Sequence, residues 1–318
     1  MESETAISTP SAPSANTHAA RLSRYGLLSV TGEDARSFLH GQLTSDIAHL
    51  ESGRARLAGW CTAKGRLLAN FLVIPSQDGF NLLLARDLVP GVAKRLGMFV
   101  LRAKVKISDL TDTLMAFGIW GPGAAARIAA LGLPGAEQPL SCVSRGDLLA
   151  VRLGDEQFLL IEPAARDGRI AALAANHADS EDQWALLEIR AGRPWVGQST
   201  QDLFVPQMVN LEAIGAIDFR KGCYPGQEIV ARAQYRGQLK RRMIRARAPA
   251  GVSLSPGQDL YSDAFADQAS GTVVNVAPAA EGSELLAVVQ TGAVAGRSPI
   301  RAAPNGPELE LQPLPYSA

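Results

Sequence analysis

Strand-like and helix-like segments alternate along the first half of the chain, and they run through a similar order twice. Short apolar runs predict strands, and apolar residues that recur every three or four positions predict helices. The first unit has expected strands over 25–30, 54–61, 67–74 and 80–85, and helices over about 35–47 and 87–100. The second has expected strands over 105–110, 114–120, 148–153 and 157–161, and helices over 122–131 and 163–176. Two such units predict an α+β fold with a pair of ferredoxin-like α/β modules.

The pattern changes beyond about Arg242, where short apolar runs are separated by Gly, Pro, Ser and Asp. Short apolar runs separated by turn residues predict a small C-terminal β-barrel. A further helix is expected before the barrel, over 182–191. The predicted organisation is a disordered tail over 1–20, two modules over 21–240 that divide near 103–110, and a barrel over 241–318.

Composition narrows the class of protein. The 318 residues include 31 basic and 31 acidic side chains, so no overall field draws the chain to nucleic acid or to a membrane surface. The three cysteines form no CxxC pair, and the histidines have no carboxylate at ligand spacing, so no resident metal site is predicted. Without a secretory signal or a membrane-spanning apolar run, the protein is expected to be cytoplasmic. Motifs of serine hydrolases, P-loop nucleotidases and zinc proteases do not occur.

The segment 221–228, Lys-Gly-Cys-Tyr-Pro-Gly-Gln-Glu, is the strongest candidate for chemistry and is called the signature loop below. Its glycines and Pro225 predict a tight, well-specified turn. Arg220 and Lys221 place positive charge beside Cys223, which favours the reactive thiolate. The alternative is that Cys223 serves only as a small apolar side chain.

A concentration of basic residues surrounds the end of this loop. Seven cations lie between Arg220 and Arg242, against the single acid Glu228. They could receive an anion such as a glutamyl tail, a phosphate or an RNA backbone, with Tyr224 and Tyr235 available for stacking. The alternative is an exposed, solvated basic segment.

These motifs resemble the YgfZ family, whose members are related to the T-protein aminomethyltransferase of the glycine cleavage system. The signature loop is followed by Ile-Val-Ala-Arg at 229–232, and further matches are Leu-His-Gly-Gln-Leu-Thr-Ser-Asp at 39–46, Ala-Lys-Gly-Arg at 63–66 and Ile-Arg-Ala-Gly at 189–192. The resemblance implies a ring of two ferredoxin-like modules and a terminal barrel around a channel that binds tetrahydrofolate or a derivative. It also implies a role in assembly or repair of iron–sulfur proteins, including enzymes that thiolate tRNA.

The resemblance also implies site residues. Cys223 would be the reactive thiol or a transient cluster ligand, with Lys221 beside it. Folate contacts are expected from Arg190, Lys221, Tyr224, Gln227, Glu228, Arg232 and Arg236. The expected partners are iron–sulfur client or assembly proteins.

The chain departs from the aminomethyltransferases at three positions. Ala69 and Asn70 stand where those enzymes carry adjacent aspartates, and Arg190 stands where they carry an acid that binds the pterin. Neither Ala nor Asn can orient the reacting amine as a carboxylate does. The leading hypothesis is therefore a folate-binding accessory protein that uses Cys223. A folate-dependent one-carbon or demethylating enzyme with a carboxylate elsewhere, such as Asp46 or Glu188, is the alternative, and direct tRNA binding is a third.

Overall fold

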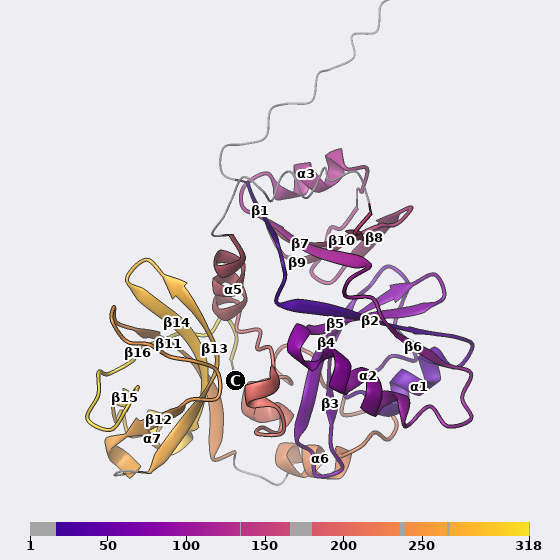
Figure 1. The fold of residues 1–318 in the computed structure, drawn as a ribbon. Coiled ribbons are helices and arrows are strands. Elements are labelled where there is room, and N and C mark those ends of the chain that lie inside the picture. Colours follow the sequence, from indigo (N-terminus) through magenta and orange to yellow (C-terminus); the bar gives the residue numbers. More distant parts are fainter. Residues whose placement is uncertain (1–16, 134, 166–179, 236–238, 266–267, 318) are drawn as a thin grey trace, which may run out of the picture.

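The computed structural model describes residues 17–133, 135–165, 180–235, 239–265 and 268–317. Three antiparallel sheets surround the centre of the molecule (Figure 1). The predicted α+β class is confirmed, and so is its arrangement as two α/β units with a curled C-terminal sheet. No described helix combines the length and the apolar character that crossing a membrane would require.

The first sheet has the order β3-β4-β5-β2-β6. Its strands are β2 (Tyr25–Thr31), β3 (Arg56–Cys61), β4 (Leu67–Ser76), β5 (Gly79–Ala85) and β6 (Lys106–Asp109). The helices α1 (Ala35–Gln42) and α2 (Val89–Gly97), the latter preceded by η1 (Arg86–Leu88), pack against it. Phe38 and Leu39 of α1 and Leu96 of α2 enter the same apolar core as the strands, so the predicted amphipathic faces are buried.

The second sheet has the order β1-β7-β10-β9-β8. Its strands are β1 (His18–Arg21), β7 (Leu114–Trp120), β8 (Cys142–Arg145), β9 (Leu148–Gly154) and β10 (Gln157–Pro163). The helix α3 (Ala124–Ala130) packs against β10, and α5 (Ser180–Arg190) contacts both β1 and the C-terminal sheet. In Figure 1, α5 lies between the second sheet and the half-barrel.

The third sheet is a curled half-barrel with the order β15-β12-β13-β14-β11-β16. Its elements are β11 (Arg241–Ala248), β12 (Asp259–Ser262), η4 (Asp263–Phe265), β13 (Ala269–Ala279), β14 (Gly282–Gln290), α7 (Thr291–Ala295), β15 (Ile300–Arg301) and β16 (Glu310–Gln312). The segment 191–235 joins α5 to it and contains η2 (Gln198–Thr200), η3 (Pro206–Val209) and α6 (Gln227–Tyr235).

Several sequence expectations need correction. The helix expected over 35–47 ends at Gln42, because Leu43 is extended and bridges to Trp60. The predicted tail extends too far, since His18–Arg21 is a strand whose Ala19 and Ala20 are buried against β7. The strand β8 and the helix α6 were not predicted. Most of the helix expected over 163–176 lies outside the described residues.

Candidate functional site

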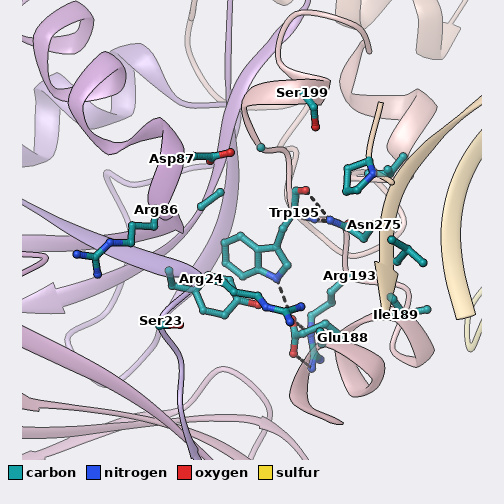
Figure 2. Close-up of a pocket in the computed structure, with 17 residues that line it drawn as sticks. Ser23, Arg24, Arg86, Asp87, Glu188, Ile189, Arg193, Trp195, Ser199 and Asn275 are labelled. Carbon is teal, nitrogen blue, oxygen red and sulfur yellow. Dashed lines mark hydrogen bonds and ion pairs between the residues drawn. The ribbon is translucent and has the colours of Figure 1, made fainter. Parts of the chain in front are cut away.

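A cavity of about 650 Å³ lies between the first sheet, α5 and the half-barrel (Figure 2). Its walls come from the start of β2, the residues around η1, the end of α5, the segment 193–199 and the middle of β13. The rings of Tyr25 and Trp195 meet edge to face with centroids 4.7 Å apart. The cavity is thus aromatic on one side, and its volume is in the range of about 300–1,000 Å³ typical of small-molecule sites. We call it the central cavity.

Glu188 is the buried acid of the central cavity, and all its lone pairs face donors. Its Oε1 accepts hydrogen bonds from Gln157 Nε2 and Arg193 Nη2, both at 2.8 Å. Its Oε2 accepts from Arg193 Nε at 3.1 Å and from Trp195 Nε1 at 3.0 Å. Burial lowers the pKa of Arg193, but the charge and hydrogen bonds of Glu188, together with the nearby Tyr25 hydroxyl, outweigh that effect and raise the pKa. Arg193 is therefore held as a cation, and Glu188 positions the cavity wall.

Asn70 and Asn275 fix the segment that carries Trp195. Asn70 Nδ2 donates to the Pro194 carbonyl and its Oδ1 accepts from Val196 N, both at 2.8 Å. Asn275 of β13 makes the same pair of bonds to the backbone of Trp195, also at 2.8 Å each. Asn70 is therefore a buried structural residue whose amide ties the first sheet to the wall of the cavity.

The rim of the central cavity carries charge that is less tightly engaged. Arg24 pairs with Asp182, and Arg86 Nη2 lies 3.0 Å from the exposed carboxylate of Asp112. Asp87 Oδ2 accepts from Gln198 N at 2.9 Å, while its Oδ1 accepts from no other described residue. This rim offers two cations and one carboxylate oxygen to a ligand.

The signature loop is anchored elsewhere, at the end of α1 and at the turn between β3 and β4. Lys221 is buried, and its Nζ donates to the His40 carbonyl and, at 2.6 Å, to the Leu43 carbonyl. It also lies 4.9 Å from the centroid of the Tyr224 ring. Burial lowers the pKa of Lys221 to about 8, although Asp46 and other anions oppose the shift. This lysine satisfies carbonyls that the helix end leaves unpaired.

The predicted site residues divide into separate groups. Cys223 is exposed, Tyr224 is buried, and Gln227 Nε2 lies 3.5 Å from the Lys221 carbonyl. Glu228 and Arg232 form an exposed pair on α6 at 3.8 Å. Arg190 instead pairs with the buried Glu284 at 2.7 Å, away from the loop. Arg236 lies outside the described residues. Among the described residues, neither Cys223 nor any residue expected to contact folate lines the central cavity, whereas Glu188, named for the alternative enzyme, does.

A cluster of His40, Asp46 and His49 beside the loop was missed in the sequence. Asp46 Oδ2 lies 2.7 Å from His49 Nδ1, and Asp46 Oδ1 lies 3.2 Å from His40 Nδ1. Burial raises the pKa of Asp46, but the hydrogen bonds from His49 and the charges of His49 and His40 together outweigh burial and lower that pKa. Burial and the nearby Lys221 charge lower the pKa of His40. In the sequence these histidines were considered only as metal ligands and this contact was overlooked, although the Asp-x-x-His spacing at 46–49 was a visible signal.

The residues of the central cavity were also largely missed. Glu188 was named only for the alternative enzyme, and Tyr25, Arg193, Trp195 and Asn275 were not singled out. The Arg-Pro-Trp run at 193–195 directly after a helix was the visible signal. No sequence signal pointed to Asn275, because only the folded structure brings β13 next to residues 193–195.

Comparisons with known proteins agree with this architecture. Residues 18–134 match the family model described as the GCVT N-terminal domain. The glycine cleavage system aminomethyltransferase T from Bartonella henselae is similar in structure with a TM-score of 0.73, at 19% identity over 95% of this chain and 86% of that one. The chain thus has the fold of the aminomethyltransferase T class.

Relatives define the family more closely. The tRNA-modifying protein YgfZ of Edwardsiella ictaluri is 36% identical over 307 residues, which cover 93% of this chain and 92% of that protein. The protein of the same name from Klebsiella pneumoniae is 32% identical over the same shares. The chain belongs to the YgfZ family, and the resemblance seen in its motifs is confirmed.

Proposed function

We propose that the protein is a folate-binding accessory factor that holds tetrahydrofolate or a derivative in the central cavity. The observation that carries the proposal is the aromatic wall of Tyr25 and Trp195 in a cavity of about 650 Å³, in a chain with the aminomethyltransferase T fold. A pterin is a flat ring that stacks on such side chains.

The polar groups of the cavity suit the rest of a folate molecule. The free Oδ1 of Asp87 can accept from the amino and ring N–H groups of a pterin. Arg24 and Arg86 at the rim can exchange their exposed carboxylate partners for those of a glutamyl tail. Glu188 remains engaged by four hydrogen bonds, which favours a positioning role over that of a free base.

Binding without aminomethyl transfer is the activity we propose. Ala69 is buried, and the Asn70 amide is hydrogen-bonded to the backbone of Pro194 and Val196. This part of β4 therefore supplies no carboxylate to a reacting amine. The one-carbon enzyme remains the alternative, and release of a one-carbon product from a folate adduct by the purified protein would favour it.

The second half of the proposal concerns Cys223. Its thiol is exposed in a loop that Lys221 anchors, so it is accessible to a partner protein or to a cluster in transit. We propose that this thiol acts in assembly or repair of iron–sulfur proteins, including those that modify tRNA. If Cys223→Ser restored iron–sulfur enzyme activity in depleted cells as fully as the wild type, this role would be wrong.

The first experiment is a calorimetric titration of tetrahydrofolate into the wild type, Trp195→Leu and Lys221→Ala. Loss of the stacking ring is expected to weaken binding by about 5- to 150-fold, equivalent to about 1–3 kcal/mol for a base on an aromatic ring. Arg247→Ala, on the half-barrel strand β11, serves as a remote control. Weakening by Lys221→Ala alone would move the folate to the signature loop, and no binding to the wild type would refute the folate proposal.

A further inference from the structure

A second cavity, of about 700 Å³, lies beside the signature loop and shares no lining residue with the central cavity. Its walls are the segment 45–56 that leads into β3, the segment 214–220 that precedes the loop, and Tyr235 at the end of α6. We call it the arginine cleft. It is built on the edge of the first sheet, whereas the central cavity uses β2, α5 and β13.

Three guanidinium groups line the arginine cleft: Arg54, Arg56 and Arg220. Arg54 and Arg56 are two residues apart at the start of an extended segment, so their side chains leave it on the same side. Arg54 Nη1 makes only long contacts with neutral groups, at 3.4 Å to Gln138 Oε1 and 3.3 Å to Ser141 Oγ.

These arginines keep their charge available. Arg56 Nη1 donates to the Asp46 carbonyl at 2.9 Å, which leaves the guanidinium without a counterion. Among the described residues, none of the three forms an ion pair, whereas Arg193, Arg242 and several others do. Uncompensated guanidinium groups that converge on a cavity favour an anionic ligand.

The acids of the cleft do not cancel this charge. Glu51 and Asp218 line it, so two carboxylates face three arginines. Asp218 Oδ1 already accepts the Arg220 backbone N–H at 2.8 Å. His49, which also lines the cleft, is turned to Asp46 through its Nδ1 at 2.7 Å. The balance of the arginines and carboxylates is one positive charge.

Aromatic rings complete the cleft. Tyr235 is 70% exposed, which is unusual for so large a ring, and its centroid lies 6.0 Å from that of Phe219. Exposed aromatic side chains beside arginines form stacking platforms for nucleobases. The cleft therefore has arginines at one part of its wall and an aromatic ring at another. Its volume is in the range of about 300–1,000 Å³ that small-ligand sites occupy.

We propose that the arginine cleft binds a nucleotide, with its phosphate on Arg54, Arg56 and Arg220 and its base on Tyr235. The ligand would lie against His49, and the His49–Asp46–His40 contacts lead from there to the carbonyl that anchors Lys221. Nucleotide binding is thereby placed next to the segment that carries Cys223, and it does not depend on folate binding in the central cavity.

The test is calorimetric titration of adenosine 5′-monophosphate and of adenosine into the full chain at low salt. The nucleotide is expected to bind saturably, and adenosine at least about tenfold more weakly, because it lacks the charge-assisted hydrogen bonds of the phosphate. Arg220→Ala and Arg54→Ala should each weaken nucleotide binding by at least about fivefold. Arg56 is left unchanged because it also holds the backbone of Asp46.

Controls separate loss of the site from loss of the fold. Arg247→Ala removes an arginine remote from the cleft and should bind as the wild type does, and all variants should keep the wild-type melting temperature. A short single-stranded RNA that binds more tightly than the mononucleotide would identify a nucleic-acid strand as the source of the nucleotide. The proposal is overturned if the mononucleotide does not bind, if adenosine binds equally well, or if both cleft variants bind normally. Tetrahydrofolate titrated into Arg220→Ala reports on the central cavity separately.

Discussion

Lys221 is a buried cation that relies on backbone carbonyls and an aromatic ring instead of a carboxylate. The carbonyls of His40 and Leu43 lie at the C-terminal end of α1, where the helix leaves acceptors unpaired and its dipole is negative. Because the lysine follows α1 by about 180 residues, it joins the signature loop to an element made much earlier. Its charge is costly to bury, which is why its pKa falls to about 8.

That pKa predicts a pH dependence of stability. Between pH 8 and the ordinary lysine value of 10.5, the unfolded chain holds a proton that the folded chain has released, so the free energy of unfolding rises with pH in this window. Lys221→Met keeps the apolar stem and removes this proton. Urea unfolding of both proteins, below pH 8 and again near pH 10, should show the wild type gaining stability relative to the variant. A constant difference between them would contradict the shifted pKa.

At the scale of elements, the signature loop is fixed by close contact between two glycine turns. Gly226 has φ +82°, and a Cβ there would lie 2.4 Å from the Thr62 carbonyl and 2.7 Å from Gly65 Cα. Gly65 has φ +70° and faces Ile229 of α6. The turn between β3 and β4 and the start of α6 can therefore approach only because both positions lack a side chain.

Gly226→Ala is accordingly expected to destabilise the protein by about 1–3 kcal/mol or more, through backbone strain and a main-chain clash. Gly222→Ala in the same loop is the matched control, because its Cβ would have His40 Nε2 as the nearest atom at 3.6 Å. That change should cost less than about 0.5 kcal/mol, as ordinary surface substitutions do. Thermal and urea unfolding measure both, and equal losses would show that the glycine contact is unimportant.

Element by element, the sequence was informative where periodicity was long and apolar. The strand β7 was predicted at its observed bounds, and the meander of β3, β4 and β5 is confirmed. The length of α1 was overestimated because Leu43 and Ile47 continue the helical spacing while being buried in the irregular segment that follows the helix. The four-residue β8 has only two apolar residues, and its last two residues are polar and exposed, so it has no such pattern. The two cavities combine segments that only tertiary structure brings together, whereas the signature loop is contiguous and was visible at once.

At the scale of the whole molecule, a few polar contacts hold the three sheets around the central cavity. Asn275 links the half-barrel to the Trp195 backbone. The buried Glu284 of β14 links it to Arg190 of α5 and also pairs with Arg245 within the half-barrel. At the C-terminal end, Tyr316 donates its hydroxyl hydrogen to the Gly192 carbonyl at 2.7 Å. These contacts converge on the segment after α5, so that segment sets the shape of the cavity.

Asn275→Ala should therefore affect both stability and binding. Two hydrogen bonds to a partly buried backbone are lost, so the free energy of unfolding is expected to fall by about 1–3 kcal/mol. Trp195 would be less firmly held, and tetrahydrofolate affinity should fall as well. Asn81→Ala in β5 is the control, because the Asn81 side chain bonds to no other described residue. Unchanged stability and affinity in Asn275→Ala would contradict the role of this contact.

The position of β1 has a consequence for how the protein is made. Ala20 pairs with Gly118, so β1 is synthesised almost a hundred residues before its partner strand, and the entire first sheet is made in between. A fragment that began after β6 would leave the edge of β7 unpaired, and such an edge readily pairs with another chain. The second α/β unit therefore cannot complete its sheet without the N-terminal strand β1. A fragment that begins at the boundary between the two units should aggregate instead of folding as an independent domain.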